Sequence, residues 1–131
     1  MSEANVEVIK SIYARFRDGD EEGALELLDP EMEVHDRPEI PDPQVYHGYE
    51  GVRAALQTSR DAFDDLDLVP EEFVDAGDRV AVVFRFQGVG RGSGVEIDER
   101  LVHLWTIRDG KPVRMDVHSS REQALKAAGV R

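Results

Sequence analysis

The sequence predicts an α+β domain, with helices in the first half and a mostly antiparallel sheet in the second. The first observation is that apolar residues recur at helical spacing in several early segments. The second is that later segments alternate in the manner of strands and follow one another through short turns. The third is Asp109-Gly110, a dipeptide that tolerates the positive φ angles of a tight hairpin. This order predicts helices packed on one face of the sheet.

Length, charge and cysteine content narrow the function classes. The chain has 131 residues, no cysteine and a formal net charge of -12. Its length fits one domain over residues 1–131, and the lack of cysteine excludes disulfides, thiolate metal clusters and a cysteine nucleophile. The acidic excess argues against nucleic acid or an anionic membrane as a partner, because phosphate binding needs clustered Lys and Arg. Without a signal pattern or a membrane-spanning apolar run, we expect a cytoplasmic protein.

Three helices are predicted in the first half of the chain. Residues 3–17 form an amphipathic helix that an Asp-Gly-Asp sequence ends, and Asp20 can cap a short second helix over residues 21–28. Pro30 ends the second helix, and a third covers residues 49–63. The apolar residues that these helices are expected to bury are Val6, Ile9, Ile12, Tyr13, Phe16, Ala24, Leu27, Leu28, Val52, Leu56 and Phe63.

Between the second and third helices the sequence predicts a strand and then a loop. Residues 31–37 alternate as a strand, which places Asp36 on the same face as two apolar residues. Residues 38–48 contain three prolines and are predicted to form a loop at a pocket rim. After the third helix, Pro70 predicts that strand 66–75 lies at a sheet edge, because proline cannot donate to a neighbouring strand.

The last part of the chain supplies the rest of the sheet and a final helix. The remaining strands are predicted over residues 79–89, 95–107 and 112–118. The glycine-rich segment 88–94 is a turn and not a phosphate-binding motif, because no helix or Lys-Ser/Thr pair follows it. A helix over residues 120–128 is predicted to begin with Ser119 and Glu122 as a capping box.

One stretch of strand, residues 101–107, is apolar on both faces. A strand that is covered on both sides lies centrally in its sheet. One face carries a single ionisable residue, His103, among Leu101, Trp105 and Ile107. An ionisable side chain in such surroundings must be paired, neutral or functional, which makes His103 the first candidate site residue.

The opposite face of this stretch carries Val102 and Leu104. The predicted helices sit on only one side of the sheet, so we expect them to leave this second face uncovered. The sequence therefore predicts a homodimer that buries the outer face of the sheet against a second copy.

Four segments carry a family resemblance: FRDGDEEGALELLDPEMEVHD, YHGYEGVRAAL, HLWTIRDGKPVRMD and REQALKAAG. With the order of elements, they make nearly the whole chain resemble the SnoaL-like branch of the nuclear-transport-factor-2-like (NTF2-like) superfamily. The resemblance implies a cone in which a curved antiparallel sheet wraps around N-terminal helices and an internal apolar pocket, with dimerisation through the outer sheet face. That superfamily hosts steroid isomerases, polyketide cyclases, epoxide hydrolases, dehydratases and non-catalytic binding modules, so the fold alone does not fix the function.

The resemblance also implies candidate catalytic residues. In the ketosteroid-isomerase pattern, the aspartate that abstracts a proton falls on Asp36, and the acid that donates to the enolate oxygen falls on His103. The phenol of the first helix falls on Ile12, and Tyr13 recovers its role if the loop lengths differ by one residue. SnoaL-type cyclases are similar in having a histidine on the penultimate strand and an acid on the last, which implies the pair His103 and Asp116.

These residues suit one kind of chemistry. Deprotonating a carbon next to a carbonyl needs a carboxylate base in an apolar pocket and a donor aimed at the developing oxyanion. Asp36 is the candidate base and His103 the candidate donor. Purely structural roles are the alternatives: Asp36 can anchor its loop, His103 can be a hydrogen-bonded core histidine, and Tyr13 can be ordinary helix packing.

The remaining expectations concern the ligand. The residues expected to contact it are Trp105, Val34, Phe84, Met115 and Phe63. No metal site is predicted, because Asp116 and His118 share a strand face without a third ligand, and no sequence motif indicates a cofactor. The sequence leaves open whether these two residues or Met115 and Val117 face the ligand.

Two hypotheses about function follow. In the first, the protein is a cofactor-free acid-base enzyme, an isomerase, cyclase or related lyase or hydrolase. Its partner would be a small hydrophobic carbonyl or polyketide-like molecule. In the alternative, the protein is a non-catalytic hydrophobic-ligand-binding or dimeric interaction domain. Polar groups that line one enclosed cavity distinguish the first hypothesis from the second.

Overall fold

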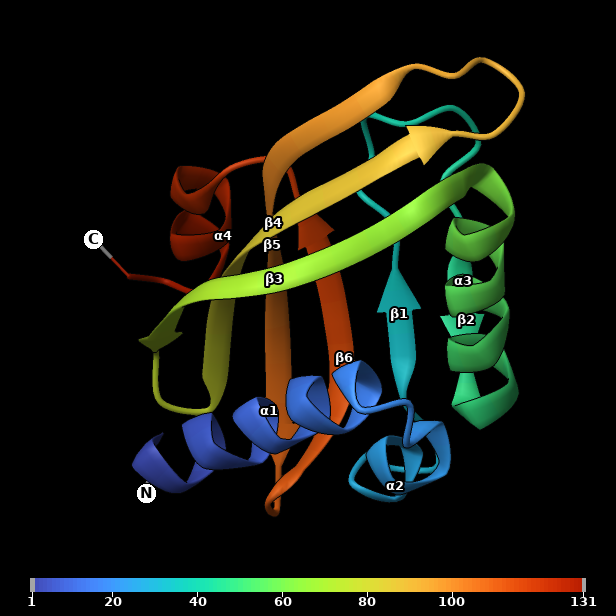
Figure 1. The fold of residues 1–131 in the computed structure, drawn as a ribbon. Coiled ribbons are helices and arrows are strands. Elements are labelled where there is room, and N and C mark those ends of the chain that lie inside the picture. The colour runs from blue at the N-terminus through green and yellow to red at the C-terminus, as the bar shows by residue number, and fades with distance from the viewer. Residues whose placement is uncertain (1, 131) are drawn as a thin grey trace.

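The computed structural model describes residues 2–130 and has the predicted α+β architecture (Figure 1). Helices come mainly first, and a meander of long strands follows. No helix within the described range is long and apolar enough to cross a membrane. In chain order the elements are α1 (Ser2–Arg17), α2 (Glu21–Glu26), β1 (Glu33–His35), β2 (Val45–His47), α3 (Gly48–Ala62), β3 (Phe63–Asp75), β4 (Arg79–Gly90), β5 (Glu96–Arg108), β6 (Lys111–His118) and α4 (Arg121–Ala127).

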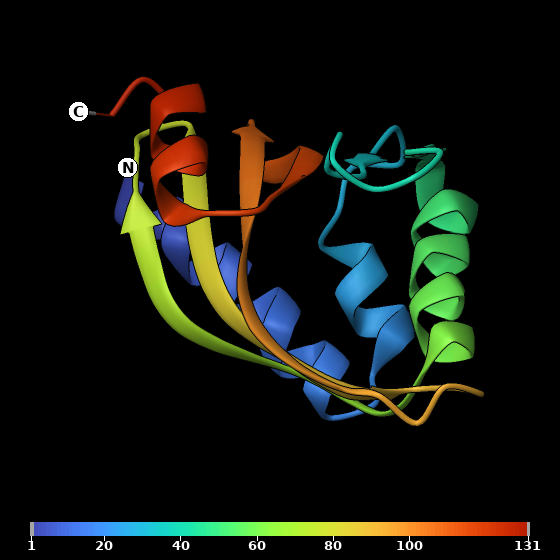
Figure 2. The same ribbon diagram turned by 90° about the horizontal axis from the view of Figure 1, so that it is seen from above.

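The strands form one curved, unclosed sheet in the order β2-β1-β6-β5-β4-β3 (Figures 1 and 2). All neighbours are antiparallel except β1 and β6. The strand that carries His103, β5, is central, and β3 with its Pro70 is an edge, so both placements are confirmed. Figure 2 shows β3, β4 and β5 bending together. The curvature agrees with two register shifts in the pairing of β3 with β4, because bulges bend a strand.

The turn between β5 and β6 is the predicted tight hairpin. Asp109 has φ 53° and Gly110 has φ 78°, the pair of positive values that a type I′ turn requires. Such a turn matches the right-handed twist of its strands and pairs Arg108 with Lys111. A register shift between Thr106 and Ile107 then moves the pairing by one residue, so that His103 lies opposite Val117 and not opposite Asp116.

The inner face of the sheet packs against α1, α2 and α3 and holds the larger core. Residues of α1 reach the sheet because Ile9 and Ile12 are spaced to lie on one side of the helix, and both are completely buried. Asp20 caps α2 as predicted, since its Oδ1 accepts from Gly23 N at 3.0 Å. The core cluster comprises Ile9, Ile12, Tyr13, Leu25, Leu28, Met32, Val34, Val52, Val80, Val82, Trp105, Ile107 and Met115.

The outer face is covered by the chain itself, contrary to the sequence prediction. Val102 and Leu104 are 1% and 2% exposed and pack with Ala81 and Ala124, the last of these from α4. The prediction that Val102 and Leu104 need a second copy to cover them is therefore wrong, because the seven-residue helix α4 covers them within one chain. Dimerisation stays a prediction that rests on the family resemblance alone.

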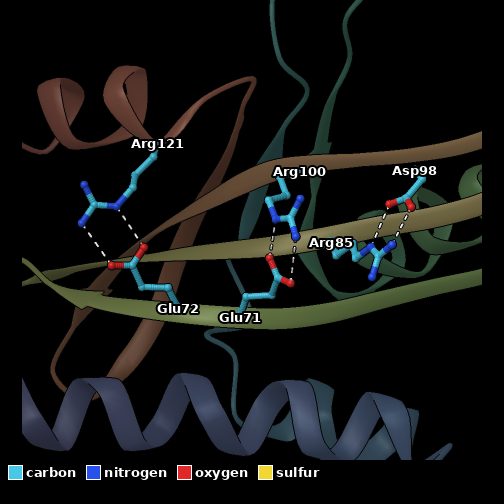
Figure 3. A network of polar contacts seen from close by, with 6 residues as sticks. All are labelled: Glu71, Glu72, Arg85, Asp98, Arg100 and Arg121. Atoms are coloured by element: carbon cyan, nitrogen blue, oxygen red, sulfur yellow. Dashed lines mark hydrogen bonds and ion pairs between the residues drawn. The ribbon is translucent and has the colours of Figure 1, made fainter.

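Ion pairs extend from α4 along β3, β4 and β5 (Figure 3). The pairs join β3 to α4, β3 to β5 and β4 to β5, with N···O distances of 2.6 to 2.9 Å. Their side chains are 35% to 61% exposed, so they lie at the rim and not in the core. The partners are Glu72 with Arg121, Glu71 with Arg100, and Asp98 with Arg85.

Several boundaries differ from the sequence prediction. The strand expected over residues 31–37 is limited to Glu33–His35, which leaves Asp36 outside it, and α2 ends at Glu26. Residues Val45–His47, expected to belong to a loop, form β2 beside β1, because the last proline of the segment precedes them and leaves their N–H groups free to pair. Phe63 opens β3 directly after α3 instead of ending the helix. The cap of α4 is Ser120, whose side chain accepts from Gln123 N, and not Ser119.

Candidate functional site

Three ring side chains from α1 and β5 form a hydrogen-bonded chain on the inner face. Trp105 Nε1 donates to Tyr13 Oη at 3.0 Å. Tyr13 Oη lies 2.6 Å from His103 Nδ1. The β-strand period of two brings His103 and Trp105 to the same face, and α1 crosses that face at Tyr13. The predicted candidates Tyr13, His103 and Trp105 therefore meet, although about 90 residues separate the first from the others.

The donor and acceptor roles in this chain follow from the chemistry of its members. An indole N–H can only donate, so the phenol oxygen of Tyr13 accepts from Trp105. The phenol hydrogen then goes to His103 Nδ1, the one acceptor within reach among residues 2–130. The reverse arrangement would leave a buried Tyr13 O–H without an acceptor, which is costly. His103 is thus a neutral imidazole with its hydrogen on Nε2.

Burial keeps both groups neutral over a wide pH range. Loss of water lowers the pKa of His103 to about 3, because burial penalises the charged imidazolium. Burial also raises the pKa of the Tyr13 phenol, and the Trp105 hydrogen bond opposes that effect only partly. Neither side chain ionises near neutral pH, so the site offers a neutral donor in place of a charge.

His103 Nε2–H is a donor without a protein acceptor. Within residues 2–130, every fully buried side-chain nitrogen or oxygen has a hydrogen-bond partner, whereas Nε2 has none. Nε2 is therefore not sealed in the core but accessible, in agreement with the partial exposure of His103 between buried neighbours. The ring of Phe84 lies 4.0 Å from the imidazole centroid and walls one side. The arrangement is an accessible donor beside aromatic surface.

Asp36 lies directly after β1, which ends at His35. The β1–β6 pairing ends with His35 beside Asp116, and the β5–β6 pairing places Val117 beside His103. Asp36 Oδ2 accepts from Gln44 N at 3.0 Å, which is the loop-anchoring contact proposed as an alternative from the sequence. Oδ1 has no partner in the described part of the chain.

Asp116 lies on the other face, so the pairing of Asp116 with His103 is wrong. Asp116 is opposite Leu104, whose side chain belongs to the outer cluster, and its carboxylate binds Arg114 at 2.8 and 2.9 Å. The same register puts Met115 and Val117 on the inner face, which settles the question that the sequence left open.

The apolar candidates divide into two groups. Val34 and Met115 lie opposite each other on β1 and β6 and are buried in the core beside Trp105. Phe63 packs edge-to-face against Phe86, with ring centroids 5.1 Å apart. Phe86 follows Phe84 on the same face of β4, so this second pair extends the aromatic surface away from His103.

Comparison with known proteins adds the family. A model of the SnoaL-like domain matches residues 9–115. The chain belongs to the SnoaL-like domain family. No functionally curated protein matches the sequence. Solved structures with the NTF2-like fold also match, so the cone-like fold implied by the resemblance is confirmed.

Three of these structures show how widely the fold is shared. TerC, crystallised with polyporic acid, is 29% identical with a TM-score of 0.76, over 96% of this chain and 98% of that one. An NTF2-like protein of Burkholderia thailandensis is 22% identical with a TM-score of 0.81, over 92% and 96%. A protein named as a SnoaL-like polyketide cyclase, from Jannaschia, is 23% identical with a TM-score of 0.75, over 98% and 93%.

This SnoaL-like domain has two features that the sequence did not reveal. One is the donor role of Trp105, which was expected only to line the ligand. The other is a polar tie at the Pro-rich loop, where Arg37 contacts Glu99 at 3.4 Å and Ser119 Oγ at 3.2 Å, and Ser119 donates to Glu39 at 2.6 Å. A tryptophan in an apolar strand pattern indicates a core residue, so the sequence gives no sign of its hydrogen bond. The partners of Arg37 lie 62 to 82 residues away in the sequence, so they leave no local signal.

Two questions remain about the charged side chains outside this site: whether they could bind a metal ion, and whether they line a pocket. Among residues 2–130, no group of three or more His, Asp or Glu side chains is arranged to hold a metal ion. A hollow of about 560 Å³ lies beside β1, β5 and β6 but contains none of the predicted site residues. Its lining is mainly charged: Asp29, Glu31, Glu33, Thr106, Arg108, Asp109, Lys111, Val113 and Arg114.

Proposed function

We propose that this SnoaL-like domain binds a small, mostly apolar carbonyl compound against the inner face of the sheet. The observation that carries the proposal is the accessible, unpartnered Nε2–H of His103 beside the ring of Phe84. A carbonyl oxygen accepts a hydrogen bond without needing a charge, which fits a neutral donor in apolar surroundings. Aromatic side chains would cover the rest of the ligand.

We further propose that the bound compound undergoes an acid-base step without a cofactor. His103 would stabilise the oxyanion that develops when a proton leaves the adjacent carbon. Asp36 is the candidate base, because it follows the inner-face strand residue Val34 by two positions and has one carboxylate oxygen without a partner in the described part of the chain.

Similarity to other family members supports the ligand class. TerC was crystallised with polyporic acid, and it is similar to this chain over nearly the full length of both. Other structural neighbours are named as SnoaL-like polyketide cyclases or as having a ketosteroid-isomerase-like fold. These names support testing polyketide-like carbonyl compounds first.

The contact between Asp36 and Gln44 favours a second candidate function. A carboxylate that anchors its loop has one oxygen occupied, so its primary role would be structural. In that case the domain binds its ligand without transforming it. The two functions share the His103 contact and differ only in the role of Asp36.

The experiment measures binding and turnover of polyporic acid and a panel of cyclic enones. Binding is measured by calorimetry, and turnover by chromatography of the products. His103→Phe should weaken binding about tenfold, because it removes the N–H donor and keeps a flat ring in an apolar site. Asp36→Asn should leave binding nearly unchanged and lower any turnover roughly a hundredfold.

Asp116→Asn is the matched control, because it makes the same chemical change on the opposite face. It should alter neither binding nor turnover. Equal binding by the wild type and His103→Phe would overturn the proposed ligand contact. Turnover that survives Asp36→Asn would overturn the assigned base, and binding without turnover would favour the second function.

A further inference from the structure

We infer that Tyr13 and Trp105 are positioning residues that hold His103 in its Nε2–H form, so that the site selects ligands that accept a hydrogen bond over ligands that donate one. The inference rests on the proposed function, because it assigns the selectivity of that same site. It departs from the role that the family resemblance implies for a phenol on the first helix. In this chain the Tyr13 hydrogen bonds to His103, which leaves none for a ligand.

The direction of the hydrogen-bond chain is set at Trp105. Its N–H can only donate, and the Tyr13 oxygen that receives it can give its single hydrogen only to His103 Nδ1. Moving the imidazole hydrogen to Nδ1 would make the phenol oxygen accept twice and would strand the buried O–H. An unsatisfied buried donor of this kind biases the equilibrium roughly ten- to a hundredfold.

Packing keeps the rings in the orientation that this chain needs. Tyr13 meets Trp105 edge-to-face, with centroids 5.9 Å apart and planes at 81°. The imidazole lies nearly parallel to the Tyr13 ring, at 18°, and has Phe84 against it at 4.0 Å. A turn of the imidazole that exchanged its edges would lose the Tyr13 bond, so Nε2 is the nitrogen that stays accessible.

A selective site follows from the fixed hydrogen. An accessible N–H attracts ketone, quinone or lactone oxygens. It repels the N–H of a pyrrole or indole, because two hydrogens would face each other. Without Tyr13 the imidazole could carry its hydrogen on either nitrogen, and Nε2 could then accept from such a donor. Tyr13 and Trp105 would thus determine specificity without touching the ligand.

The first part of the test is nitrogen NMR of ligand-free protein labelled at histidine. The protein has four histidines, so His103→Gln assigns the signals. In the wild type we expect a protonated Nε2 and an unprotonated Nδ1 for His103. Tyr13→Phe should shift both nitrogens toward averaged values, as a mixture of tautomers does, and Trp105→Phe should give a smaller shift in the same direction.

The second part compares two ligands of similar shape, 1-indanone as acceptor and indole as donor. The wild type should prefer the ketone, and the ratio of their dissociation constants should change by roughly tenfold in Tyr13→Phe. Tyr49→Phe is the control, because it removes a hydroxyl that donates to Leu28 O and lies outside the chain of rings. It should leave both the nitrogen signals and the ligand ratio unchanged.

The possible failures are distinguishable. Wild-type His103 with its hydrogen on Nδ1, or a Tyr13→Phe protein with unaltered nitrogen signals, would overturn the inference whatever binds. If 1-indanone binds well through His103 but the ligand ratio is the same in Tyr13→Phe, the inference fails while the proposed function stands. If no carbonyl compound binds the wild type, the proposed function fails and the selectivity fails with it.

Discussion

The two faces of β5 differ in what they carry: the inner face carries the candidate site, and the outer face packs against α4. On the inner face, His103 presents a hydrogen-bond donor that no protein group satisfies. On the outer face, Val102 and Leu104 are buried under α4. Ion pairs join α4 and the neighbouring strands (Figure 3). The charged groups of these ion pairs bind one another within the chain, whereas His103 Nε2–H has no partner in the described residues. This difference is why we propose the ligand site on the inner face.

Charge behaves differently on the two faces as well. At the outer rim, the hydrogen bond from Arg121 lowers the pKa of Glu72, and the hydrogen bond from Arg85 lowers the pKa of Asp98. These groups are held in their charged forms. On the inner face, burial keeps His103 uncharged. A mutation on one face should therefore disturb properties that a mutation on the other leaves intact, and this separation can be tested.

The largest effect on stability is expected on the outer face. Leu104→Ala should lower the free energy of unfolding by about 2 to 5 kcal/mol, because it leaves a cavity under α4. Urea denaturation measures the loss. Ligand affinity of the remaining folded protein should not change. A loss below about 1 kcal/mol would show that α4 packs less tightly on Leu104 than its burial implies.

The next effect is a dependence of stability on pH that comes from His103. Its pKa is about 3 in the folded protein and about 6.5 when unfolded. Between these values the unfolded chain binds a proton that the folded one does not. This contribution is therefore complete above pH 6.5 and declines by about 1.4 kcal/mol per pH unit as the pH falls toward 3.

Denaturation of the wild type and His103→Gln at pH 6.5, 5.5 and 4.5 isolates this term, since the carboxylates titrate in both proteins. The stability difference between them should shift against the wild type as the pH falls. A difference that does not vary with pH would mean that folded His103 protonates as easily as an exposed histidine, contrary to the burial of its ring.

A smaller effect is expected at the start of α4. Ser120→Ala removes the side chain that caps this helix and should cost about 1 kcal/mol of unfolding free energy. Thermal denaturation measures it, with Ala127→Ser, on an exposed position of the same helix, as the comparison. Because α4 covers only the outer face, the nitrogen NMR signals of His103 should stay as in the wild type.

The smallest effect is expected from the rim. Arg100→Gln breaks the ion pair with Glu71, but both groups are open to solvent and screened by salt. Unfolding free energy and ligand affinity should change little, and less at high salt. A large loss would mean that the rim pairs, and not the apolar patch, hold α4 and the outer face in place.

Much of the fold could be predicted because its signals are local. The spacing of Ile9 and Ile12, the Asp20 cap, Pro70 at an edge and the Asp109-Gly110 turn each act within a few residues, and each is confirmed. The errors arise where tertiary pairing decides. Strand β2 exists only because β1 lies beside it, and the return of α4 over Leu104 depends on the whole sheet.

The candidate site was predictable residue by residue but not as an arrangement. His103 stands out in the sequence as an ionisable group in an apolar strand, and alternation correctly joins it to Trp105. The contact of both with Tyr13 depends on where α1 crosses the sheet. The register of β6, which removes Asp116 from the site, comes from a register shift between Thr106 and Ile107 that no residue pattern in the sequence indicated.

The central claim is that His103 Nε2–H is the polar contact for a carbonyl ligand on the inner face. The most direct measurement is a crystal structure of the protein with a carbonyl ligand from the binding screen. We expect a ligand oxygen about 2.7 to 3.2 Å from Nε2, with the Phe84 ring against the ligand. A ligand bound in the charged hollow beside β1, or on the inner face with no oxygen near Nε2, would contradict it.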